Sequence, residues 1–156
     1  MSAGPNTVVR RNSDDQRLAV MSVKVLDPDE ALDFYVNKLG LEVGNDIKQG
    51  TYRWITVRVP GDPSTEIHLD KPGPPVQDEA TAEQLRELIA KGAMGGPVFE
   101  TDDVRGLYET LKARGVTDFT QEPNDNFYGT DMGVRDPFGN AIRILQRGKV
   151  AKAAKA

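Results

Sequence analysis

Alternating apolar and polar residues mark the first predicted element, a β-strand over residues 18–25. Its two faces carry Met21, Val23 and Val25 on one side and Val20, Ser22 and Lys24 on the other. A helix is predicted next, because Asp27 can cap its first turn, Pro28 suits that turn, and Gly40 can end it. The apolar stripe of this helix is Ala31, Leu32, Tyr35 and Leu39. Further strands are predicted over residues 41–43, 52–59 and 66–70.

The second half of the chain repeats this order of elements. A strand predicted over residues 98–101 is followed by Asp102 and Asp103 as candidate helix caps, and Gly115 ends the helix. The apolar stripe of this helix is Val104, Leu107, Tyr108 and Leu111. At an offset of 75 residues, the strand residues Ile67, His68 and Leu69 fall on Ile142, Arg143 and Ile144. Each half is therefore predicted to be a βαβββ module.

A linker with one helix is predicted between the two modules. Three prolines within residues 71–76 interrupt regular structure, because proline lacks an amide donor and has a fixed φ. Thr81 and Gln84 can form a capping box, and Gly92 can end the helix. Its predicted apolar stripe is Leu85, Leu88 and Ile89. The predicted segments are a disordered N-terminus (1–16), a single domain (17–147) made of module one (17–70), linker (71–95) and module two (96–147), and a basic flexible tail (148–156).

Strand alternation divides the predicted sheets into an apolar face and a polar face. The apolar set, expected under the helices, is Met21, Val23, Val25, Ile55, Val57, Val59, Ile67, Leu69, Phe99, Ile142 and Ile144. The opposite set is Val20, Ser22, Lys24, Tyr52, Trp54, Thr56, Arg58, Glu66, His68, Asp70, Val98, Glu100 and Arg143. A face this polar is more typical of a ligand pocket than of a packed core. The predicted fold class is α+β, two βαβββ modules with curved mixed sheets around a shared cavity.

Composition narrows the chemistry. The 156 residues suit one domain, and the absence of cysteine excludes disulfides, thiol nucleophiles and thiolate metal sites. The single histidine excludes any one-chain site that needs two imidazoles. A net charge of −4 argues against nucleic-acid binding. No apolar run approaches the roughly 18 residues of a membrane span, and no apolar segment near the N-terminus suggests a signal peptide. We therefore expect a cytoplasmic protein with neither nucleic acid nor membrane as a partner.

Four segments together resemble the vicinal-oxygen-chelate superfamily, which includes glyoxalase I, the extradiol dioxygenases and the bleomycin-resistance proteins. They are VMSVKVLDPDEALDFYVNKLGLEV, RWITV with TEIHL, GGPVFETDDVRGLYETLKARGV, and GVRDPFGNAIRIL, and they extend over residues 17–147. The most specific piece is the turn Asp136-Pro137-Phe138-Gly139-Asn140, which resembles the D-P-x-G-N turn before the last strand of the family. The resemblance implies two βαβββ modules that curve around one pocket, commonly built from two chains, and hence a homodimer.

In metal-dependent members of this family, one ligand comes from the first and one from the last strand of each module. The resemblance places these positions at Val20, His68, Gly96 and Arg143. A catalytic metal usually needs three protein ligands, but valine and glycine supply none and arginine supplies a permanent cation. Two unit positive charges 4 Å apart repel by about 4 kcal/mol at an effective dielectric constant of 20. We therefore expect no metal and no other cofactor at this site.

The remaining polar-face residues are candidates for ligand contact. His68 is the candidate general base, and Arg143 can clamp an oxyanion with its planar guanidinium. The alternatives are that His68 is held by Glu66, Asp70 or water, and that Arg143 forms an internal ion pair with Glu66 or Glu100. Trp54 and Tyr52 can stack on a planar ligand, or fill the core instead. The further candidate ligand-binding residues are Arg58, Glu66, Glu100, Phe127 and Tyr128. Glu100 and Asp131 are also alternative metal ligands.

Two functional hypotheses follow from this polar face. The first is a small-molecule-binding protein of the bleomycin-resistance kind, which sequesters or carries a planar or anionic organic ligand. The second is an enzyme, either a metal-independent glyoxalase-like lyase or isomerase that uses His68 as base and Arg143 as a charge stabiliser, or an unusual metal-dependent lyase or dioxygenase. The first is favoured, because the residues offer no third positioned catalytic group.

Overall fold

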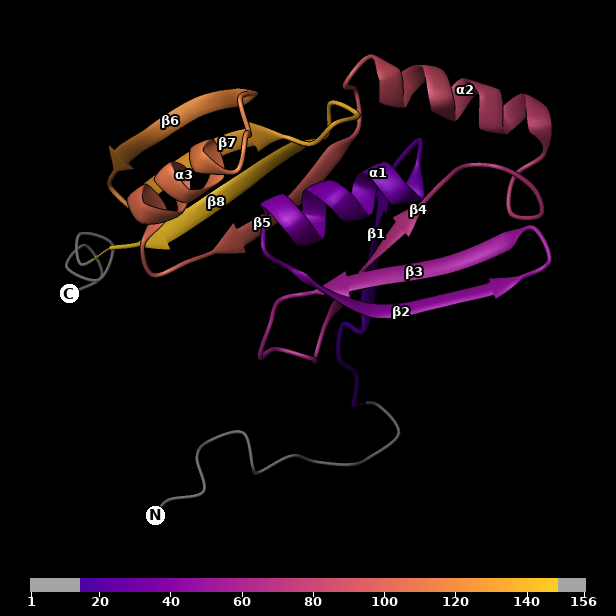
Figure 1. Ribbon diagram of the computed structural model, residues 1–156, viewed down its shortest axis with the longest axis horizontal. Helices are drawn as coiled ribbons and strands as arrows, with labels where there is room; N and C mark the ends of the chain where they lie inside the picture. Colours follow the sequence, from indigo (N-terminus) through magenta and orange to yellow (C-terminus); the bar gives the residue numbers. More distant parts are fainter. Residues whose placement is uncertain (1–14, 149–156) are drawn as a thin grey trace.

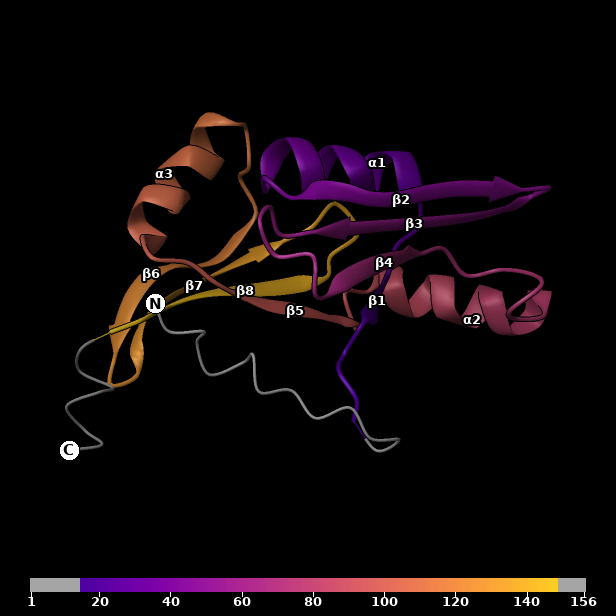
Figure 2. The same ribbon diagram turned by 90° about the horizontal axis from the view of Figure 1, so that it is seen from below.

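Two four-stranded sheets, each with its own helix, make up the structure, a computed structural model that describes residues 15–148 (Figure 1 and, turned by 90°, Figure 2). The predicted N-terminal disorder and basic tail lie almost entirely outside these residues. The elements of the first module are β1 (Val20–Lys24), α1 (Pro28–Leu32) continued by the π-helix η2 (Asp33–Lys38), β2 (Glu42–Gln49), β3 (Tyr52–Arg58) and β4 (Glu66–Asp70). Helix α2 (Glu79–Ala90) follows. The second module contains β5 (Gly95–Glu100), α3 (Val104–Ala113), β6 (Phe119–Asn126), β7 (Gly129–Arg135) and β8 (Ala141–Arg147).

The two sheets have the same topology. The strand order is β1-β4-β3-β2 in the first sheet and β5-β8-β7-β6 in the second. In each sheet the first and last strands of the module are parallel, and the other pairs are antiparallel. The predicted α+β fold of two βαβββ modules is confirmed, and His68 and Arg143 lie on corresponding strands, β4 and β8.

Short polar side chains begin the module helices as predicted. The Asp27 carboxylate accepts hydrogen bonds from the backbone N–H groups of Asp29 and Glu30, and Asp103, not Asp102, caps α3 through the N–H of Gly106. Gly40 and Gly115 follow these helices with φ values of +96° and +92°. Such a left-handed conformation favours glycine, which has no Cβ to clash with the preceding turn.

Helix α2 differs from its prediction in its cap and in one residue of its apolar stripe. Asp78 is the cap, because its carboxylate accepts a 2.7 Å hydrogen bond from the Thr81 N–H, so Thr81 lies inside the helix. Ala82 and Ile89 are fully buried, whereas Leu88 is 41% exposed. Of the predicted stripe, Ile89 lies in the core and Leu85 is half-buried, so only Leu88 was placed wrongly.

The core forms between the helices and the apolar faces of the sheets, as expected for most of the predicted residues. Val25, Ile55, Val57 and Ile142 are fully buried, and other members of the predicted set lie in the same core. Met21 and Val59 are exceptions, with exposed fractions of 55% and 41%. Met21 lies near the start of β1, an edge strand, and Val59 follows the last residue of β3, so each has few neighbours to cover it.

Hydrogen bonds join the two modules, and β1 and β5 lie next to each other. The Tyr35 hydroxyl donates to Asp136 Oδ2 at 2.6 Å, and Asn140 Nδ2 donates to the Lys24 carbonyl at 2.7 Å. Burial raises the pKa of Tyr35 well above its ordinary value, and the adjacent Asp136 carboxylate raises it further. The D-P-F-G-N turn is therefore part of the contact between modules. Within residues 15–148, no helix is long and apolar enough to span a membrane.

Candidate functional site

Two stacked rings lie on the polar face of the first sheet. Trp54 on β3 and His68 on β4 have ring centroids 4.1 Å apart and an interplanar angle of 25°. Ser22 lies beside His68 on β1, the strand that pairs with β4 on the side away from β3, and its Oγ is 3.4 Å from His68 Nδ1. His68 is only 7% exposed, whereas Trp54 is half-buried. Trp54 therefore presents an aromatic surface that the protein itself covers only in part.

The charge state of His68 follows from its surroundings. Burial lowers the pKa of His68, since a protonated imidazole loses hydration there. The Asp70 carboxylate opposes this shift and Lys24, which is ion-paired with Asp70, reinforces it. At neutral pH this face therefore presents a neutral aromatic pair. The expected holders of the His68 ring, Glu66 and Asp70, bind other groups, and its hydrogen-bond partner is Ser22.

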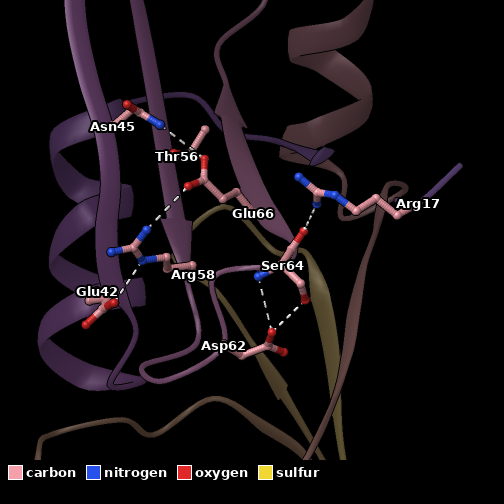
Figure 3. Close-up of polar contacts among 8 residues, drawn as sticks. All are labelled: Arg17, Glu42, Asn45, Thr56, Arg58, Asp62, Ser64 and Glu66. Carbon is pink, nitrogen blue, oxygen red and sulfur yellow. Dashed lines mark hydrogen bonds and ion pairs between the residues drawn. The ribbon is translucent and has the colours of Figure 1, made fainter. Parts of the chain in front are cut away.

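Glu66 organises a polar network beside the stacked rings (Figure 3). Its carboxylate accepts hydrogen bonds from Thr56 Oγ1 at 2.7 Å and Asn45 Nδ2 at 3.2 Å. Its Oε2 also lies 3.8 Å from Arg58 Nη1, within the range of an ion pair. Arg58 also donates to Glu42 through Nε at 2.8 Å. The predicted ligand contacts Arg58 and Glu66 are thus brought together, and each is already engaged by protein groups.

Gly44 on β2 makes room for this network. A Cβ at this position would lie 2.6 Å from Glu66 Oε2 and 2.7 Å from Thr56 Oγ1, which is closer than such atoms approach. Figure 3 also shows the turn before β4, where Asp62 accepts hydrogen bonds from Ser64 and the Ser64 carbonyl accepts one from Arg17. These contacts position the start of β4 and hence Glu66.

An ionic cluster occupies the corresponding face of the second sheet. Asp131 on β7 accepts hydrogen bonds from Arg143, from Tyr128 at 3.0 Å, from Gln121 at 3.1 Å and from Asn126 at 3.0 Å. Burial alone would raise the pKa of Asp131, but the bonds from Arg143 and Tyr128 outweigh it and hold the pKa below its ordinary value. The expected alternative for Arg143, an ion pair with Glu66 or Glu100, is wrong, since its partner is Asp131.

Arg143 keeps donors for a ligand. Its hydrogen bonds to Asp131 and to Gln121 use only one terminal nitrogen, Nη2, and its side chain is 37% exposed. A Cβ at Gly133 would lie 2.8 Å from the other terminal nitrogen, so this glycine leaves space for the guanidinium. Glu100 lies elsewhere on this module and pairs with Arg147 at 3.1 Å.

Phe127 and Tyr128 form the turn between β6 and β7. Their rings meet edge-to-face with centroids 5.2 Å apart, and Phe127 is 75% exposed. Tyr128 is tied to the Asp131 cluster, so the turn connects an exposed aromatic ring to the ionic group. This position suits the rim of a binding surface.

The stacked pair and the ionic cluster occupy equivalent places in the two modules. Thr56 faces His68 across the β3–β4 ladder, and Gly133 faces Arg143 across β7–β8. Trp54 lies two residues before Thr56, and Asp131 lies two residues before Gly133. Trp54 is therefore diagonal to His68 in the first sheet, as Asp131 is to Arg143 in the second. Sequence analysis did not predict this role of Asp131, because the offset of 75 residues that aligns β4 with β8 does not align Trp54 with Asp131, which lie 77 residues apart.

The residues present do not fit a metal centre. Val20 and Gly96 offer no ligand atom, and Arg143 keeps its charge beside Asp131. Within residues 15–148, no group of three or more histidine, aspartate or glutamate side chains is placed to hold a metal ion. In this part of the chain, no hydrogen bond, ion pair or ring contact joins the stacked pair to the Arg143 cluster. The aromatic pair and the ionic cluster are therefore separate groups, one on each sheet.

Comparison with known proteins supports a family assignment. The family model described as the Glyoxalase/Bleomycin resistance protein/Dioxygenase superfamily matches residues 17–144. The uncharacterized protein YurT of Bacillus subtilis (strain 168) is 35% identical over 132 residues, which cover 84% of this chain and 99% of YurT.

Two solved structures are similar across the same region. UcmS2 is 43% identical with a TM-score of 0.79, and the match covers 84% of this chain and 98% of UcmS2. TnmS3, an antibiotic binding protein from Streptomyces sp. CB03234, is 26% identical with a TM-score of 0.69, and the match covers 88% of this chain and all of TnmS3. The topology, the turn at residues 136–140 and these matches establish that the chain belongs to the glyoxalase/bleomycin resistance protein/dioxygenase superfamily.

Proposed function

We propose that this protein binds a small planar organic molecule and sequesters or carries it without chemical change. The observation that carries the proposal is the Trp54–His68 stack, which places a half-buried indole beside a buried neutral imidazole on an otherwise polar face. Aromatic faces bind planar molecules by stacking at little conformational cost. The similarity to TnmS3, which is an antibiotic binding protein, supports a small-molecule ligand.

Binding is favoured over catalysis by the arrangement of the two candidate catalytic residues. His68 and Arg143 lie on different sheets, and each is engaged by a neighbour in its own module. A general base needs to reach the proton that it removes while a second group stabilises the developing charge. His68 is only 7% exposed and is stacked on Trp54, so its ring offers little surface to a proton on a ligand even if an Arg143 from a second chain lies opposite.

We further propose that two chains associate so that the second sheet of one covers the first sheet of the other. Such a dimer would enclose each ligand between the Trp54 wall and the Arg143 wall. The aromatic wall would take the planar surface of the ligand, and Arg143 would donate to an oxygen at its edge. Light scattering is expected to give the mass of two chains, and a monomer at all concentrations would contradict this part of the proposal.

Ligand binding can be measured through the protein itself, because Trp54 is the only tryptophan. Titration with planar bicyclic and tricyclic phenols is expected to quench its fluorescence, with calorimetry giving the affinity. Trp54→Ala should weaken the calorimetric affinity by roughly tenfold or more, since stacking on one aromatic side chain contributes about 1–3 kcal/mol. Leu88→Ala, at an exposed position on α2, is the control. Equal affinities for Trp54→Ala and wild type would refute the proposal, and turnover abolished by His68→Ala would replace it with the enzyme hypothesis.

A further inference from the structure

Strands β3 and β4 separate soon after they meet. Their ladder contains only the pairs Thr56↔His68 and Val57↔Ile67, whereas β2 and β3 stay paired as far as Gln49↔Tyr52. Figure 1 shows the β2–β3 hairpin extending away from β4, which turns toward α2. The first sheet is therefore open on the side of the Trp54–His68 stack that lies toward Tyr52.

A cavity of about 370 Å³ lies in this opening. Its lining includes Tyr52 and Arg53 of β3, His68 and Asp70 of β4, and Glu79 and Arg86 of α2. The loop that completes the wall is held in place, because Gly73 N–H donates to Gln77 Oε1 at 2.9 Å and the Gln77 N–H donates to the Gly73 carbonyl at 3.0 Å. The opening is thus a formed cavity bounded by three elements.

This cavity adjoins the proposed ligand site through His68 and Tyr52. His68 lines the cavity and also stacks on Trp54, and Tyr52, another lining residue, precedes Trp54 on the same face of β3. A planar molecule stacked on Trp54 would therefore have one edge directed at the cavity, and a substituent on that edge would enter it.

The charges of the cavity wall are already paired. Arg53 binds Asp29 and Asp46, each at 2.9 Å, and Asp70 binds Lys24. Arg86 binds Glu79 and, at 3.0 Å, Glu83. An ionic substituent would have to displace one of these partners. A hydroxyl group can donate to a carboxylate and accept from a guanidinium, so it can join the existing pairs without displacing either member.

We infer that this cavity binds a neutral, hydroxyl-rich substituent, such as a sugar or polyol group, carried by the planar ligand. The inference rests on the proposed function, since the planar part is held by Trp54. It predicts a ligand composed of two parts, an aromatic body on the sheet face and a polar neutral group between β3, β4 and α2.

Three probes that share one ring system test the inference by calorimetry with the full chain. They are 1-naphthol, its neutral β-D-glucopyranoside and its anionic phosphate ester. We expect the glucoside to bind at least about tenfold more tightly than naphthol, as two or more added hydrogen bonds would allow. The phosphate should show no such gain. A glucoside that binds no more tightly than naphthol, or a phosphate that binds more tightly than the glucoside, would overturn the inference and leave the proposed function intact.

Two exposed glutamates on α2 provide matched variants. Glu79 and Glu83 both pair with Arg86, but only Glu79 lines the cavity. Glu79→Ala should abolish most of the advantage of the glucoside while the affinity for naphthol stays within about twofold, and Glu83→Ala should change neither. Equal effects of the two variants would also overturn the inference. If none of the three probes binds, the proposed function fails at this site and the inference fails with it.

Discussion

Replacement of Tyr35 by phenylalanine removes one hydroxyl from the contact between the two modules. The Asp136 carboxylate accepts four hydrogen bonds, and Tyr35 supplies the shortest, at 2.6 Å. In Tyr35→Phe, Asp136 Oδ2 would keep only the bond from Asn140 Nδ2, at 2.8 Å. Both Tyr35 and Asp136 are buried, with exposed fractions of 0% and 3%, so water does not readily replace the lost donor.

The expected loss is about 2 kcal/mol, since hydrogen bonds to charged groups contribute roughly 1.5–3 kcal/mol. For a chain of 156 residues this corresponds to a fall in Tm of roughly 4–8 °C. Because burial and Asp136 raise the pKa of Tyr35, its hydroxyl remains protonated and donates throughout the neutral range. The difference between wild type and Tyr35→Phe should therefore not vary between pH 6 and 9.

The assay is urea unfolding followed by both circular dichroism and Trp54 fluorescence. Tyr128→Phe is the matched control, because Tyr128 also donates to an aspartate, Asp131 Oδ2, at 3.0 Å but is only half-buried. Water can replace its hydroxyl, so this variant should lose less stability than Tyr35→Phe. A loss below about 0.5 kcal/mol for Tyr35→Phe, or a larger loss for Tyr128→Phe, would refute the reasoning.

Three further predictions concern the polar faces of the sheets. Gly44→Ala should cost about 1–3 kcal/mol in urea unfolding, because its Cβ would press on Glu66 and Thr56; Gly95→Ala, with open space around the added Cβ, should be neutral, and equal losses would contradict the account. The free energy of unfolding should fall as the pH drops through about 6.5, because His68 then gains a proton in the unfolded chain, while its lowered pKa keeps it neutral in the folded chain. This loss should level off below the folded-state pKa, and it should be absent in His68→Gln. Because the folded-state pKa of Asp131 is lowered, its ionised carboxylate stabilises the wild type above the unfolded-state pKa, and this stability is lost as the pH falls through the folded-state pKa. Arg143→Met removes the ion pair and should reduce this stability, so an unchanged acid-unfolding midpoint would argue against the ion pair.

The repeat in the sequence predicted most of the fold because its signals are local. Asp27 and Gly40 bound the first helix through caps that depend on neighbouring residues, and strand alternation placed residues such as Ile55 in the core. The exposure of Met21 was not predictable in this way, since it depends on β1 being an edge strand.

The candidate site was only partly predictable for a related reason. His68 and Arg143 were placed on polar faces by alternation, but the partner of Arg143 depends on the register between β7 and β8. The cavity near Tyr52 depends on the point at which β3 and β4 separate, which no local pattern in either strand specifies. Long-range register and strand divergence thus mark the limit of the sequence-based prediction.

The two diagonal pairs, Trp54–His68 and Asp131–Arg143, make the two modules chemically different although their backbones have the same topology. Two modules with identical side chains at these places would enclose a pocket whose two walls could be exchanged, and a bound molecule would fit equally well after a half-turn. With one wall aromatic and the other ionic, that half-turn would bring the flat surface of the ligand against charges and its oxygen atoms against rings. In the proposed dimer, the difference between the Trp54–His68 pair and the Asp131–Arg143 pair therefore selects a single orientation of the bound molecule.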